Sequence, residues 1–148
     1  MLKAILKTGL IAGTMDGLAA VVILAKMNFT GVFQYVASGV FGKASFEGGT
    51  ATTIAGVGFH YFNAFAFTVF YFAIYPRFAF LQKQMLVSAL VYGIFVWCVM
   101  NLIVVPMSNV AMAPFNWGRA LLNMAILIVC IGLPIAYFVK NYYASKNS

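Results

Sequence analysis

Four apolar stretches, at residues 5–25, 51–75, 85–105 and 120–139, constrain the fold of this chain more than any other feature. A helix of about 20 apolar residues crosses roughly 30 Å of hydrocarbon. With 64% hydrophobic and 7% charged residues among 148, the chain has too few charges to cover a water-soluble globule. The sequence therefore predicts one domain, residues 1–148, that folds as an all-α integral membrane four-helix bundle.

The net charge of +7 has to be explained within that fold. Lysines and arginines occur singly between the spans and do not form the basic patch of a nucleic-acid-binding protein, so no nucleic-acid partner is expected. Alternating the span ends puts six of them on one side and three on the other: Lys3, Lys7, Arg77, Lys83, Lys140 and Lys146 against Lys26, Lys43 and Arg119. The positive-inside rule then predicts that both termini are cytoplasmic.

The first span has an alternative interpretation as a signal peptide, because Lys3 and Lys7 precede an apolar run. The length of that run and its interruption by Asp16 favour a membrane span. Cys98 and Cys130 both fall inside spans, where a cysteine is usually a small packing residue. Neither a disulfide nor a metal site is expected, since no CxxC-type spacing occurs.

The connection between the first two spans is too polar to cross a membrane and too aromatic to float free in water. Phe33, Val36, Val40 and Phe41 recur in it at roughly helical spacing. A short helix over about residues 31–41, lying in the outer membrane interface, is expected. At the other end of the chain, the tail "KNYYASKNS" is expected to hold interfacial tyrosines and to fray at its polar end.

Small residues mark one face of each of the first two spans. Gly9, Gly13 and Gly17 form two successive GxxxG steps, a pattern that lets a neighbouring helix approach closely. The second span has a comparable face that includes Gly56. Helix packing is the expected role of all four glycines, and the GxxxG pattern alone indicates no particular function.

Asp16, one of only two acidic residues, lies on the glycine face of the first span. His60, the one histidine, and Asn63 share the small-residue face of the second. At 1.5 Å per residue, Asp16 and His60 fall within about one helical turn in depth. An unpaired carboxylate at the bilayer centre costs about 2.5–3.5 kcal/mol, so the two residues are expected to pair. Neutral Asp16 donating to His60 and an ion pair with imidazolium both remain open.

Two roles follow for such a pair. It can be a hydrogen-bonded clip between two helices, or a proton- or ion-responsive site with Asn63 beside it. Haem ligation by His60 with Met15 is a weaker alternative, and no cofactor is expected. A hydrolase is disfavoured because the pair lacks an evident nucleophile with a third orienting group. In the other two spans, Asn101 and Asn123 lie at similar depth, and an amide bridge between them is expected to hold that hairpin. Pro134 is expected to kink the fourth helix.

Three patches resemble the YagU-like group of uncharacterised bacterial inner-membrane proteins: "GLIAG", "FHYFNAFAFTVFY" and "VYGIFVWCVMNLIVVPMSNVAMAPF". The resemblance extends in patches over about two thirds of the chain, which is shorter between its first two spans than members of that group. The resemblance implies about four membrane helices, location in the bacterial inner membrane and, at most, a connection to acid tolerance.

Three functional classes remain. The first is a small transport or channel-type protein that responds to protons through Asp16 and His60, and a single narrow bundle favours a homo-oligomer for that role. The second is a non-catalytic accessory or assembly subunit of a larger membrane complex. The third, a lipid-modifying enzyme, has no catalytic set in the sequence.

Overall fold

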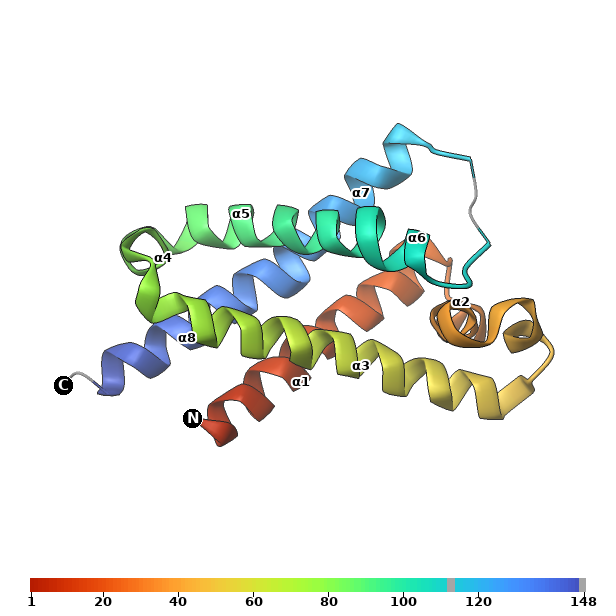
Figure 1. The fold of residues 1–148 in the computed structure, drawn as a ribbon, viewed down its shortest axis with the longest axis horizontal. Helices are drawn as coiled ribbons and strands as arrows, with labels where there is room; N and C mark the ends of the chain where they lie inside the picture. Colours follow the sequence, from red (N-terminus) through yellow and green to blue (C-terminus); the bar gives the residue numbers. More distant parts are fainter. Residues whose placement is uncertain (112–113, 147–148) are drawn as a thin grey trace.

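Four long helices run lengthwise through the computed structural model, which describes residues 1–111 and 114–146 (Figure 1). Each is long and apolar enough to cross a membrane: Leu2–Leu24, Gly49–Arg77, Met85–Met107 and Trp117–Lys146. The elements are α1 (Leu2–Ala19), η1 (Ala20–Leu24), α2 (Phe29–Phe41), η2 (Gly42–Phe46), α3 (Gly49–Ile74), η3 (Tyr75–Arg77), α4 (Ala79–Lys83), α5 (Met85–Cys98), η4 (Val99–Val104), α6 (Val105–Met107), α7 (Trp117–Leu127), η5 (Ile128–Gly132) and α8 (Leu133–Lys146). The all-α, four-span fold predicted from the sequence is confirmed.

The fourth span is longer than expected. It continues as α8 to Lys146, where the sequence suggested a frayed tail. Tyr143 explains the difference, because its hydroxyl donates to the Phe72 carbonyl oxygen at 3.0 Å and its ring stacks on Tyr75 with centroids 5.1 Å apart. Tyr142 packs edge-on against Phe72. These contacts hold the last turns of α8 against α3.

Three of the spans contain a stretch of π-helix: η1, η4 and η5. Two of these stretches end two residues before a proline, Pro106 for η4 and Pro134 for η5. Proline lacks the N–H donor, and its ring crowds the carbonyl four residues back, so a wider turn relieves the clash. The irregularity expected at Pro134 therefore takes the form of a π segment preceding it.

Helix α2 lies across the bundle, and Figure 1 shows it nearly end-on beside α3. Asn28 caps its start, accepting a hydrogen bond from the Gly31 N–H at 2.9 Å. Against α3 the approach is so close that a Cβ on Gly56 would collide with the Phe33 carbonyl oxygen. The end of α2 is held by Asn109, which follows α6. Its backbone N–H donates to the Gly39 carbonyl oxygen and its Nδ2 donates to the Val40 carbonyl oxygen, each at 3.0 Å. The helix expected over about residues 31–41 is present and begins two residues earlier, at Phe29, and its location in the membrane interface stays a prediction.

The apolar core fills the half of the bundle nearest the two termini. Its buried members come from all four spans and from α4: Ala12, Tyr71, Phe72, Tyr75, Leu81, Ala89, Tyr92, Val96, Leu127, Ile131, Ile135, Ala136 and Val139. Two of the three buried tyrosines in this core have hydrogen-bonded hydroxyls, as burial favours. Tyr92 donates to the Phe67 carbonyl at 2.6 Å, and Tyr71 donates to Ser88 at 3.1 Å. The polar side chains described next lie beyond this core, toward α2.

Candidate functional site

The contact between α1 and α3 creates the candidate site. Gly9, Gly13 and Gly17 are all buried, and aromatic side chains of α3 occupy the space that side chains on α1 would fill. A Cβ on Gly13 would lie 2.9 Å from the Tyr61 ring and 3.1 Å from Ala64. The glycine face thus permits the close packing that brings polar groups of the two helices together.

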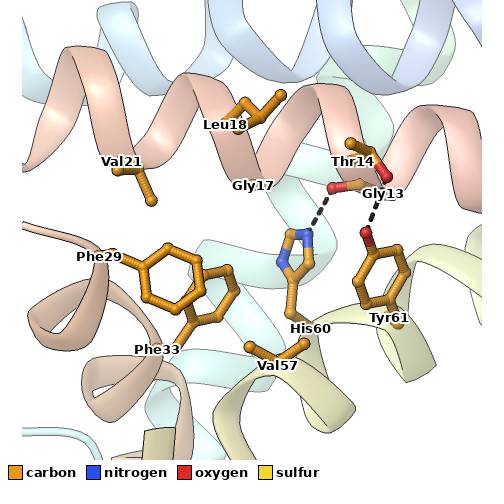
Figure 2. Close-up of a pocket in the computed structure, with 10 residues that line it drawn as sticks. All are labelled: Gly13, Thr14, Gly17, Leu18, Val21, Phe29, Phe33, Val57, His60 and Tyr61. Carbon is orange, nitrogen blue, oxygen red and sulfur yellow. Dashed lines mark hydrogen bonds between the residues drawn. The ribbon is translucent and has the colours of Figure 1, made fainter. Parts of the chain in front are cut away.

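Asp16 and His60 meet at this contact. His60 Nδ1 lies 4.0 Å from Asp16 Oδ2, with the side chains 13% and 18% exposed, respectively. That separation is within ion-pair range but too long for a hydrogen bond. The bond that His60 does make is to the backbone, since its Nε2 lies 2.7 Å from the Gly13 carbonyl oxygen, as Figure 2 shows. The structure brings the two residues together, with Gly13 as a third participant.

The Gly13 contact limits the protonation states of His60. A carbonyl oxygen can only accept, so the proton of this bond belongs to Nε2. Nδ1, facing Asp16, is then either a lone-pair acceptor in neutral imidazole or a second donor in imidazolium. Both protonation patterns expected from the sequence remain chemically possible. They differ in whether the proton lies on Nδ1 of His60 or on the Asp16 carboxyl group.

His60 lines two cavities. The first, here called the α1–α2 cavity, has a volume of about 170 Å³. Its lining is mostly apolar: Gly13, Thr14, Gly17, Leu18, Val21, Phe29, Phe33, Val57, His60 and Tyr61 (Figure 2). Thr14 Oγ1 and the Tyr61 hydroxyl share a hydrogen bond of 2.7 Å at its edge. Phe33 reaches this cavity from α2, and its ring packs edge-on against His60 at 5.7 Å.

The second cavity, here called the polar cavity, has a volume of about 90 Å³. Asp16, His60 and Asn63 supply its polar groups, and the remaining lining is Val36, Ala64, Phe67, Val96, Met100, Leu127 and Ile131. Asn63 makes no hydrogen bond to any residue in the described part of the chain. Three candidate residues from the sequence therefore line one small cavity. His60 lies between this cavity and the α1–α2 cavity and lines both.

The expected amide bridge between Asn101 and Asn123 is not formed. Asn101 instead donates from Nδ2 to the Trp97 carbonyl oxygen of its own helix at 3.0 Å. Asn123 is half-buried and has no hydrogen bond within residues 1–111 and 114–146. A carbonyl four residues back is always within reach of a helical side chain, whereas a partner on another helix must be brought into register.

Sequence reasoning missed four participants in the site. The Gly13 carbonyl has no sequence signature, because every residue carries one. Tyr61 and Thr14 carry no signal of a site, because both residue types are common at membrane depth, although Tyr61 directly follows His60. Phe33 was assigned to an interfacial helix, and only the close approach of α2 to Gly56 brings it to the site.

Comparison with protein-family models, curated proteins and solved structures gives no match to this chain. Among the described residues, no group of three or more histidine, cysteine, aspartate or glutamate side chains is placed to hold a metal ion. Interpretation of the site therefore rests on its own geometry.

Proposed function

We propose that this membrane protein is a small proton-responsive transport-type protein in which Asp16 and His60 take up and release a proton as a unit. The observation that carries the proposal is the position of His60. Its Nε2 is held by Gly13, its Nδ1 faces Asp16 at 4.0 Å, and its ring lines both cavities. Free space on two sides of the ring supports proton exchange at His60.

The energetics favour a shared proton. An unpaired carboxylate at membrane depth costs about 2.5–3.5 kcal/mol on insertion scales, so Asp16 has to be neutralised by its own proton or by imidazolium. Histidine is the side chain whose ordinary titration falls near physiological pH. Because the two groups are so close, they titrate together and their protonation states belong to the pair. Loss of one proton leaves a net negative site, and a conformational response follows from that charge.

Apolar side chains form a barrier on each side of the pair, which supports a transport-type role. Toward the outer end, Phe33 and Val36 of α2 line the cavities and cover the pair. Toward the termini, Phe67 lines the polar cavity, and the Tyr92 hydroxyl donates to the Phe67 carbonyl oxygen at 2.6 Å. Such a site exchanges with one side at a time when one of these barriers moves. Because a single four-helix bundle leaves little room for a pore, the proposal includes a homo-oligomer.

Proton flux into proteoliposomes across an imposed pH gradient tests this function, with a trapped pH-sensitive dye as the readout. Asp16→Asn and His60→Gln are expected to abolish the flux of the unmodified protein. Glu47→Gln is the matched control, because Glu47 is the only other acidic residue and follows η2 outside the spans. Flux that persists undiminished in Asp16→Asn, or that is lost equally in Glu47→Gln, contradicts the assigned role.

A second candidate is a non-catalytic accessory subunit in which the same residues clip α1 to α3. The two cross-helix hydrogen bonds favour it, His60 with Gly13 and Thr14 with Tyr61, both 2.7 Å. Native mass spectrometry of the protein released from detergent-free membrane patches discriminates the two. A stable hetero-complex supports the accessory role, whereas a homo-oligomer without other chains supports transport.

The proposed location is the bacterial inner membrane with both termini in the cytoplasm. The charge asymmetry between the span ends supports this orientation. In Figure 1 the start of α1 and the end of α8 lie at the same end of the bundle, as four spans require. Labelling of Lys83→Cys and Lys43→Cys by a membrane-impermeant maleimide tests it. In intact spheroplasts Lys43→Cys is expected to react and Lys83→Cys is not.

A further inference from the structure

We propose that the α1–α2 cavity binds one acyl chain of a membrane phospholipid whose phosphate group pairs with Lys26. The inference goes beyond the proposed function, because it needs no change of protonation at Asp16 or His60. It assigns the larger cavity of the site to a lipid that is held against α1 and covered by α2.

The lining of the cavity suits hydrocarbon. Phe29 and Phe33 reach it from α2 with their ring centroids 4.7 Å apart, and Val57 lines it from α3 (Figure 2). On the α1 side, Gly13 and Gly17 leave the helix backbone bare of side chains. The cavity is therefore a space between apolar side chains and a smooth helix face.

The polar groups at the cavity are already hydrogen-bonded. Thr14 Oγ1 and the Tyr61 hydroxyl bond to each other at 2.7 Å. His60 Nε2 lies 2.7 Å from the Gly13 carbonyl oxygen. A buried water typically needs two to four polar partners, whereas cavities without free polar groups stay dry and take up apolar molecules. An apolar occupant is therefore favoured over water.

The shape of the cavity fits a chain. Its lining follows one face of the first span from Gly13 through Gly17 to Val21, a length of about 12 Å at 1.5 Å per residue. Its volume is about 170 Å³. Since an apolar cavity of about 150 Å³ takes up benzene, there is room for about six carbon atoms. An elongated space of this size accommodates part of an alkyl chain.

The bilayer has direct access to the cavity. Leu18 and Phe29, which line it from α1 and α2, are 58% and 52% exposed, respectively. Leu18 lies within a membrane span, so its exposed side faces hydrocarbon. The apolar molecules available there are the acyl chains of the surrounding lipids, and they enter sideways between α1 and α2.

The turn after the first span brings a positive charge to one end of the cavity. The Met27 N–H donates to the Val21 carbonyl oxygen at 2.8 Å, so the chain folds back over Val21 and places Lys26 near it. Lys26 is exposed and forms no ion pair within residues 1–111 and 114–146. A lipid phosphate supplies the missing negative charge.

The backbone of this turn supports a role for the lysine. Lys26 and Met27 have φ angles of 48° and 73°, in the left-handed region that helix ends normally give to glycine. Residues other than glycine are strained there, and such strain occurs preferentially at functional positions. We attribute the lysine at this position to its ammonium group, which binds the phosphate while the chain lies in the cavity.

Photocrosslinking in nanodiscs of phosphatidylethanolamine tests the inference, with a small fraction of phosphatidylcholine that carries a diazirine in the middle of one acyl chain. Val21 is 7% exposed and lines the cavity, whereas its neighbour Val22 is 53% exposed and lies outside both cavities. Crosslinks to both residues are expected in peptides analysed by mass spectrometry. Val57→Phe fills the cavity and is expected to lower the Val21 yield at least fivefold without changing the Val22 yield.

Val69→Phe is the matched control, because it makes the same change on α3 at a position that is 48% exposed and outside both cavities. It is expected to leave both yields unchanged. Val57→Ala enlarges the cavity and is expected to keep the Val21 crosslink, which separates filling of the cavity from damage to the fold. Absence of a Val21 crosslink in the unmodified protein, or an equal Val21 yield in Val57→Phe, means ordinary bilayer contact only and overturns the inference.

Native mass spectrometry of the same nanodisc samples tests the phosphate contact. One phospholipid per chain is expected to stay bound to the unmodified protein and to be lost in Val57→Phe. Lys26→Gln is expected to lower the fraction of chains with bound lipid at least threefold. Lys43→Gln is the matched control, because Lys43 is an exposed lysine of η2 that no contact places near the cavity. Equal lipid retention in Lys26→Gln and the unmodified protein overturns the pairing of Lys26 with the phosphate.

Discussion

The Nε2 of His60 lies 2.7 Å from the carbonyl oxygen of Gly13, and this bond turns the other ring nitrogen toward Asp16. The GxxxG face of α1 makes the contact possible, because a side chain at Gly13 would displace Tyr61 and Ala64. A packing motif thereby determines how a titratable ring is oriented. The backbone acceptor also persists whatever the protonation state of Asp16.

The first prediction concerns the tautomer of His60. Because the Gly13 carbonyl can only accept, neutral His60 is expected to carry its proton on Nε2. Nitrogen-15 NMR of histidine-labelled protein at high pH reports the two ring nitrogens separately. The Nε2–H pattern is expected both in the unmodified protein and in Asp16→Asn, which retains Gly13. A neutral Nδ1–H ring would contradict the geometry.

The second prediction concerns the packing of α2 against α3. Gly56→Ala introduces a Cβ that collides with the backbone carbonyl of Phe33, which cannot rotate away as a side chain can. We expect a loss of about 1–3 kcal/mol in the free energy of unfolding, as for other overpacked cores. Equilibrium unfolding in mixed micelles measures it.

Gly58→Ala, on the same helix, is the control for that change. Its new Cβ has no atom within 4 Å, and Gly58 is exposed. Replacement of an exposed helical glycine by alanine is expected to be neutral or slightly stabilising. Equal destabilisation by the two substitutions would mean that the contact between Gly56 and α2 is not the cause of the loss.

The spans and their pairing were predictable because simple physical lengths govern them. Hydrocarbon thickness sets the length of each apolar stretch, and the rise per residue sets the depth of each polar side chain. Depth counting placed Asp16 and His60 at one level, and the structure has them 4.0 Å apart. Two antiparallel helices with small-residue faces leave few other arrangements.

Depth counting failed for Asn101 and Asn123 because depth is only one of the coordinates that a contact requires. Rotation about the helix axis also has to match, and Asn101 has a local acceptor in the Trp97 carbonyl. The Gly13 carbonyl was unpredictable for a related reason, since backbone acceptors are identical along the chain. The C-terminal turns of α8 depend on two tyrosines whose partners lie on α3, far away in sequence.

The third prediction tests that C-terminal anchor. Tyr143→Phe removes the hydroxyl that donates to the Phe72 carbonyl and leaves the ring. A loss of about 0.5–1.5 kcal/mol is expected, together with faster amide hydrogen exchange in the last turns of α8. Tyr137→Phe is the control, because Tyr137 is 50% exposed and makes no hydrogen bond among the described residues. Similar exchange rates in the two variants would contradict the anchoring role.

The fourth prediction concerns α2 as the cover of the site on the side proposed to face outward. Phe33 lines the α1–α2 cavity and packs on His60, so Phe33→Ala is expected to open a path from the outer side. Val57 lines the same cavity, and Val57→Cys provides a thiol reporter there. In inverted and right-side-out vesicles, reaction of this thiol with a charged methanethiosulfonate reagent measures access from each side.

Labelling of Val57→Cys is expected to be slow from both sides and to become several-fold faster from the outer side alone when Phe33→Ala is added. Phe41→Ala is the control on the same helix, since Phe41 is 48% exposed, contacts Phe59 and lies outside both cavities. Protein without the reporter corrects for any reaction of Cys98 or Cys130. Faster labelling from the cytoplasmic side would place the opening at the Phe67 barrier, and the assignment of α2 as the outer cover would then be wrong.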